Sequence, residues 1–126
     1  MIARWIADIG VDLVYTDDLP TTWLGAYLDD ERRILIRRGL TRALNQQTLA
    51  HEFMHAWHGD RSSHPTIEWR AWRGAARIIV DPAEYAAAER VSTSSLYIAQ
   101  ELGTTVKIIE AYRKALVRGE ILAEAA

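Results

Sequence analysis

The chain has 126 residues, of which 49% are hydrophobic and 25% charged, and its formal net charge is −2. This length and composition predict a single domain over residues 1–126, large enough to fold on one core. There is no cysteine. Disulfides, iron–sulfur clusters and thiolate metal sites are therefore excluded, so a transition metal would have to bind histidine and carboxylate.

The charge balance and hydropathy pattern also limit the class of protein. A dedicated nucleic-acid binder usually carries an excess of basic residues, which this chain lacks. No apolar run is long enough to span a bilayer, so no membrane association is predicted. The N-terminus carries Asp8 and Asp12 and has no small-residue cleavage site, which argues against a signal peptide. We expect a cytoplasmic protein.

Short elements are predicted for the first forty residues. Residues 1–9 have the spacing of a short amphipathic helix that ends at Gly10. Alternating or β-branched patterns then predict three strands, over residues 11–16, 23–28 and 33–38. A polar loop joins the last two strands as a hairpin. Arginines flank the last strand and predict a solvated sheet edge; they are Arg32, Arg33, Arg37 and Arg38.

The apolar spacing beyond residue 40 is helical. Capping residues, glycine stops and an Asp81-Pro82 helix start divide this part into five helices. Their expected ranges are Thr41 to about His58, Pro65 to about Val80, Pro82 to about Arg90, Ser94 or Ser95 to Gly103, and Thr104 or Thr105 to Leu116. A small sheet followed by a helical array indicates an α+β fold.

The first long helix contains the sequence His51-Glu52-Phe53-Met54-His55. Histidines four residues apart lie on one helix face, so two imidazoles can reach one zinc ion. Glu52 is offset from them and can reach a water at the metal, where it can act as a general base. The pattern predicts a zinc site with His51 and His55 as ligands and Glu52 as the catalytic residue.

A catalytic zinc site needs a third protein ligand. His58 is too far along the helix axis to share a metal with both histidines. Asp60 and His64, in the loop after the helix, are possible ligands. Glu68 is the best placed, because it lies on the first turns of the next helix, which a short loop turns back alongside the first. Alanines let such helices approach closely; they are Ala71, Ala75 and Ala76.

These residues resemble the ImmA/IrrE family of small zinc metallopeptidases. The resemblance rests on HEFMHAWHGD, on the Glu68-x-x-Ala71 helix and on the preceding hairpin WLGAYLDDERRILIRR, and it extends from about residue 10 to about 117. It implies zinc ligands His51, His55 and Glu68, with Glu52 as catalytic base. The family commonly has Asp or Asn and then an aromatic residue after the alanine, where this chain has Trp72 and Gly74.

The resemblance also implies a fold and a function. The fold would be a small antiparallel or mixed sheet with a zincin-like active-site helix and a C-terminal helical hairpin. Several members of that family cleave or inactivate helix-turn-helix transcriptional repressors, and many are encoded by phages or other mobile elements. The expected function is therefore that of a zinc-dependent endopeptidase with a protein substrate, bound as a strand along the hairpin. The alternative is a non-catalytic regulator that binds a repressor or DNA and carries a structural zinc.

Residues 94–117 have the small, turn and apolar positions of a helix-turn-helix, at Ala99, Gly103 and Ile109. As a DNA reader, its second helix would offer basic side chains at positions 107, 113 and 114. The acidic balance of the chain, and Glu110 in the middle of that helix, favour packing or protein docking instead. Tyr85 and His64 are candidates for stabilising an oxyanion in a peptidase transition state.

Overall fold

The computed structural model describes residues 1–121. Its elements, in chain order, are α1 (Ile2–Asp8), β1 (Asp12–Thr16), β2 (Gly25–Leu28), β3 (Arg33–Arg37), α2 (Arg42–His58), α3 (Pro65–Ile79), α4 (Pro82–Val91), α5 (Ser95–Leu102) and α6 (Val106–Val117). Every predicted element is present, and the ends lie within about two residues of their expected positions. The α+β prediction is confirmed. In the part of the chain described, no helix is long and apolar enough to cross a membrane.

The three strands form one mixed sheet in the order β1-β3-β2. β3 pairs with β1 in parallel and with β2 in antiparallel orientation. The arginine-flanked strand is thus central, and the prediction of a solvated edge there is wrong. Two of the four guanidinium groups bind loop carbonyls instead. Arg37 donates to the Trp23 and Pro20 carbonyls at 2.8 and 2.7 Å, and Arg32 donates to the Ile9 carbonyl at 2.9 Å.

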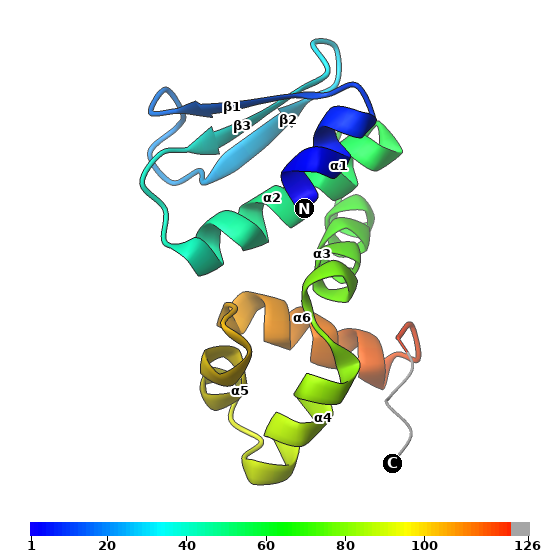
Figure 1. Ribbon diagram of the computed structural model, residues 1–126. Coiled ribbons are helices and arrows are strands. Elements are labelled where there is room, and N and C mark those ends of the chain that lie inside the picture. Colours follow the sequence, from blue (N-terminus) through cyan, green and yellow to red (C-terminus); the bar gives the residue numbers. More distant parts are fainter. Residues whose placement is uncertain (122–126) are drawn as a thin grey trace.

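The sheet packs with one face on α1 and α2 (Figure 1). Ile34 and Ile36, two residues apart on β3, point to this face and are fully buried, as is Ile6 of α1. β2 forms one edge of the sheet and lies against α2. The helix that carries the histidine motif therefore runs beside a sheet edge whose backbone is free on one side.

Gly25 lets β2 and α2 approach each other. A Cβ at this position would lie 2.7 Å from Cγ2 of Thr48 on α2 and 2.8 Å from the Leu35 carbonyl oxygen on β3. Both contacts are far shorter than van der Waals distance, so only glycine fits without displacing the strand. The close approach brings the β2 edge next to the middle of α2.

The bounds of α2 follow from its end residues. The Thr41 side chain accepts a hydrogen bond from the Leu44 backbone N–H at 3.3 Å, and Gly59 ends the helix in the left-handed conformation with φ of 64°. The chain then turns, and α3 packs along α2. A Cβ at Gly74 would lie 2.8 Å from the sulfur of Met54, so glycine at this position leaves room for the Met54 side chain between the two helices.

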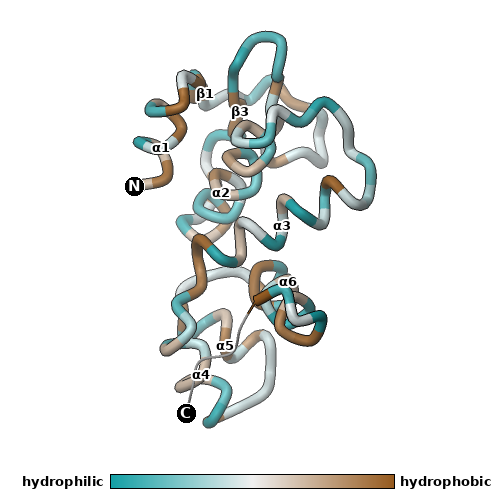
Figure 2. Tube along the Cα trace, turned by 90° about the vertical axis from the view of Figure 1, so that its right-hand side faces the viewer, coloured by the Kyte–Doolittle hydropathy of each residue, from teal (hydrophilic) through white to brown (hydrophobic). Residues whose placement is uncertain are grey.

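The remaining helices, α4, α5 and α6, form an array at the opposite end of the molecule from the sheet (Figures 1 and 2). The array is not detached, because α6 packs back onto α3. Ile108 and Ile109 of α6 are fully buried in the same cluster of apolar residues that contains Ile34 and Ala75. The array is thereby joined to the helix that follows the histidine motif.

Candidate active site

A cleft of about 930 Å³ opens between β2 and α2. One wall is formed by β2 and its flanking residues, from Trp23 to Glu31. One face of α2 forms the opposite wall, and the connection to α3 with the start of that helix closes one side. The α2 and α3 side chains in the lining are Gln47, Thr48, His51, Glu52, His55, Glu68 and Trp72. The cleft thus contains the whole predicted site.

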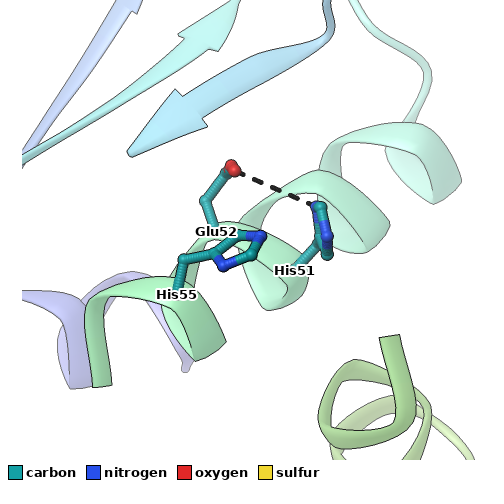
Figure 3. A group of neighbouring side chains, drawn as sticks. All are labelled: His51, Glu52 and His55. Carbon is teal, nitrogen blue, oxygen red and sulfur yellow. Dashed lines mark ion pairs between the residues drawn. The ribbon is translucent and has the colours of Figure 1, made fainter. Parts of the chain in front are cut away.

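The histidine motif lies in the middle of this cleft. Potential ligand atoms of His51, Glu52 and His55 all lie within 4.8 Å of one another. The two imidazoles leave α2 on the same side, with ring centroids 4.7 Å apart, while Glu52 points toward the sheet (Figure 3). The helical spacing therefore places the pair of histidines together and the glutamate beside them, as the sequence predicts.

Glu68 on α3 faces both histidines. Its Oε2 is 3.0 Å from Nε2 of His51, and its Oε1 is 3.1 Å from Nε2 of His55. The Nε2 atoms of both rings thus converge on one carboxylate from a different helix. His64 lies apart from this group: its side chain accepts a hydrogen bond from the Thr66 backbone N–H and forms the N-cap of α3.

Asp60 contacts the opposite side of the His55 ring. Its Oδ2 is 3.0 Å from Nδ1 of His55, and its Oδ1 accepts a hydrogen bond from Arg70 at 2.6 Å. The Asp60 side chain is only 7% exposed. A carboxylate on Nδ1 fixes the tautomer and orientation of the ring and leaves Nε2 free for a metal. The sequence offers Asp60 as a possible metal ligand. The structure places its carboxylate where it orients His55, which is a proposed ligand.

The sequence did not reveal a role for Trp72. Its indole stacks on the His51 imidazole, with centroids 4.1 Å apart and planes 15° apart. The Lys107 ammonium of α6 lies 4.7 Å from the centroid of the same indole. One signal was available: Trp72 follows Glu68 by four residues, a spacing that places both on one face of a helix.

Burial controls the protonation of the motif. It lowers the pKa of His51 to about 3, and the positive charges of His55 and Lys107 add to this effect. His51 is therefore neutral near pH 7, which is the form that binds metal. Burial raises the pKa of Glu52 to about 7, and the Glu68 carboxylate adds to the rise while His55 opposes it. A carboxylate with a pKa near the working pH suits a general base.

These residues fit a zinc ion. Tetrahedral zinc with bonds of 2.0–2.1 Å has ligand atoms about 3.3 Å apart, close to the 3.0 and 3.1 Å between the histidine nitrogens and Glu68. Two imidazoles and one carboxylate form a common catalytic zinc set. Among the described residues, Oε2 of Glu52 is buried without a hydrogen-bond partner. Such an atom needs a partner in the cleft, such as a water.

Neither oxyanion candidate lies at the cleft. The Tyr85 hydroxyl donates to Glu89 at 2.7 Å and accepts from Arg113 at 2.9 Å, within the α4–α6 array. His64 is at the exposed start of α3 and is not part of the cleft lining. The structure thus places both candidates outside the cleft lining, and the turn after α3 takes Tyr85 away from the motif.

Residues 6–112 match the model of a peptidase family described as the IrrE N-terminal-like domain. The chain belongs to this family. The match spans β1 to β3, the motif helix and α3, and so includes every residue of the site above. The resemblance inferred from the motif is thereby confirmed, and the HExxH residues are the candidate metal site of an IrrE-like metallopeptidase domain. No curated protein sequence matches the chain.

The fold is also similar to that of a solved structure, a Mycobacterium tuberculosis transcriptional regulator. The TM-score is 0.66 at 17% sequence identity, and the match covers 90% of this chain and 40% of the regulator. At this identity the likeness concerns the fold. The IrrE-like chain described here spans about 40% of the length of that regulator.

Proposed function

We propose that this IrrE-like domain is a zinc-dependent endopeptidase. The observation that carries the proposal is the convergence of three side chains in an open cleft, with a fourth beside them. The Nε2 atoms of His51 and His55 face Glu68 at 3.0 and 3.1 Å, and the buried carboxylate of Glu52 lies next to them. His51, His55 and Glu68 are the proposed ligands, and Glu52 is the proposed catalytic base.

The mechanism follows from the positions of these residues. Zinc, when bound, supplies Lewis-acid activation of water and of the substrate carbonyl. Glu52 takes a proton from the attacking water and passes it to the leaving amine of the cleaved peptide. Asp60 holds the His55 ring from Nδ1, and Arg70 holds Asp60. Burial raises the pKa of Glu52 to about 7, so the carboxyl group can both take up and release a proton near neutral pH.

The edge of β2 is the proposed binding site for the substrate backbone. β2 forms the wall of the cleft opposite α2, and its outer edge has no strand partner in the described sheet. An extended peptide can add to such an edge through main-chain hydrogen bonds, which places its carbonyls across the cleft from the motif. This binding mode selects an unfolded or flexible segment of a protein, because a helix cannot pair with the edge.

We further propose that the substrate is a helix-turn-helix repressor of a phage or mobile element, cleaved or inactivated in the cytoplasm. The alternative DNA-reading role needs free basic side chains on α6. Lys107 and Lys114 instead lie over Trp72 and Trp69, at 4.7 and 4.5 Å from the ring centroids. Arg113 is bound to Tyr85 and to Ser95. These contacts support packing and argue against DNA binding.

The experiment that tests this function uses a repressor encoded beside the gene for this chain. The purified repressor is incubated with the zinc-loaded protein and followed by mass spectrometry. Cleavage at one peptide bond is expected, with loss of cleavage on chelation and recovery when zinc is restored. Tight binding of an intact repressor, with derepression in cells, would instead support the non-catalytic regulator.

A variant of Glu68 tests the third ligand. Glu68→Gln removes the charge but keeps the shape, so we expect weaker zinc binding with little change in the fold. Removal of groups that orient ligands costs about 10–100-fold in affinity, and loss of a charged ligand should cost at least that. His64→Ala is the control and should bind zinc like the wild type. The reverse result, weak binding in His64→Ala alone, would contradict the assignment.

A further inference from the structure

The two histidines of the site differ in what holds their rings. Nδ1 of His55 has the Asp60 carboxylate at 3.0 Å. Nδ1 of His51 has no hydrogen-bond partner among the described residues, and the nearby Oε1 of Glu52 is 3.9 Å away, beyond hydrogen-bond distance. A metal-binding histidine almost always donates its second ring N–H to a partner that fixes its orientation. Something else must hold the His51 ring.

The His51 ring has a stacking contact on its face in place of a hydrogen bond at Nδ1. Trp72 stacks on it nearly parallel, at 4.1 Å and 15°. The stack leaves the imidazole little freedom to rotate about its Cβ–Cγ bond, because rotation would drive ring atoms into the indole. This is the motion that would turn Nε2 away from Glu68. The stacked indole can therefore fix the orientation of the His51 ring, as the Asp60 carboxylate fixes that of the His55 ring.

Trp72 is itself held by α6. The Lys107 ammonium lies 4.7 Å from the indole centroid, a cation–π contact. Two residues earlier, the Thr105 hydroxyl donates to the side-chain oxygen of Gln47 at 2.6 Å. Gln47 is buried on α2, one turn before His51. The start of α6 thus contacts both helices of the site, α2 through Thr105 and α3 through Lys107.

We propose that Trp72 is a positioning residue of the metal site. Its indole fixes the direction in which His51 presents Nε2, and Lys107 of α6 fixes the indole. The proposal rests on the zinc site proposed above. It also gives the C-terminal helices a part in metal binding, since the residue that immobilises the stack comes from α6.

Trp69 provides a matched control. It lies one turn before Trp72 on α3, is also half-buried, and also has a lysine over its ring, with Lys114 at 4.5 Å. Its indole N–H, however, donates to Glu120 at 3.1 Å, and no histidine of the described residues stacks on its ring. Substitution of Trp69 removes a similar amount of packing from the same helix without touching a proposed ligand.

The test is zinc affinity, measured by competition with a chromogenic chelator, for folded variants of the full chain. Trp72→Leu should weaken zinc binding about 10–100-fold, the usual cost of losing a group that orients a ligand. Trp72→Phe keeps an aromatic face and should restore affinity to within about threefold of wild type. Trp69→Leu should bind zinc like the wild type. In the cobalt-substituted protein, the visible spectrum should change in Trp72→Leu and not in Trp69→Leu.

Lys107→Met extends the test with a substitution at an exposed position, so it does not depend on whether Trp72→Leu folds. Loss of the cation–π contact should weaken zinc binding about two- to fivefold. Equal affinity in wild type, Trp72→Leu and Lys107→Met would overturn the proposal, as would equal weakening in Trp72→Leu and Trp69→Leu. Failure of the wild type to bind zinc would instead overturn the proposed function, so the two results are distinguishable.

Discussion

Glu52→Gln is expected to retain zinc and fold but to lose cleavage of the repressor by at least about 10²–10⁴-fold, the usual contribution of a general base. Glu52 lies beside the proposed ligands without replacing one, since the Nε2 atoms of His51 and His55 face Glu68. The amide has nearly the same shape as the carboxylate but cannot take the proton. The measurement is kcat/KM for repressor cleavage at matched zinc content.

Derepression in cells separates the two candidate functions. If the domain acted by binding alone, Glu52→Gln would derepress as well as the wild type at equal expression. That result would contradict catalysis and leave zinc as a structural element. A simultaneous loss of zinc in Glu52→Gln would instead contradict the division of roles between Glu52 and Glu68.

The same variant has a second readout in the metal-free protein. Burial raises the pKa of Glu52 from 4.5 to about 7. A group with a raised pKa contributes stability that is complete below pH 4.5 and is lost as the pH rises through 7. Glutamine does not titrate. Between pH 4.5 and 7, the free energy of unfolding of the wild type should therefore fall relative to that of Glu52→Gln. Urea titrations of both proteins at several pH values measure the difference.

Zinc should raise the melting temperature of the protein strongly. A ligand that binds only the folded state stabilises it by about 4 kcal/mol when its free concentration is about a thousandfold above Kd. For a domain of this length, that corresponds to an increase in Tm of roughly 10–20 °C. His51→Ala and His55→Ala should lose this increase, because each removes one of two nitrogens that converge on the site. Differential scanning calorimetry with and without zinc measures the effect.

His58→Ala is the control for this experiment. His58 ends α2 one turn after His55, but it is exposed and does not line the cleft. It should keep the full zinc-dependent increase in Tm. An equal loss of the increase in His58→Ala and His55→Ala would indicate nonspecific binding of zinc to surface histidines and would contradict a site built on the motif.

Local signals explain how much of the fold could be predicted. Thr41 and Gly59, which begin and end α2, are recognisable from residue type alone. The strand order could not be predicted, because it depends on which strands meet through space. β3 lies between β1 and β2, so its flanking arginines do not line a sheet edge, and two of them, Arg32 and Arg37, bind loop carbonyls.

The candidate site likewise has residues that could be predicted from the sequence and residues that could not. His51, Glu52 and His55 lie within one helix, and their arrangement follows from helical spacing. Glu68 was predictable because a short loop turns α3 back along α2. The supports of the site come from farther away: Asp60 acts through Nδ1 of His55, and Lys107 reaches Trp72 from α6. No pattern in the sequence indicates these contacts. Tyr85, by contrast, is a candidate site residue from sequence, but the fold places it away from the cleft.

The proposed function depends most directly on one zinc ion per chain in this cleft. Native mass spectrometry of protein purified without added metal, and again after addition of one equivalent of zinc, measures the stoichiometry. If the proposed function is correct, the wild type and Glu52→Gln each hold a single tightly bound zinc, and His51→Ala and His55→Ala hold none. A wild-type protein that contains no zinc and takes none up on titration would contradict it.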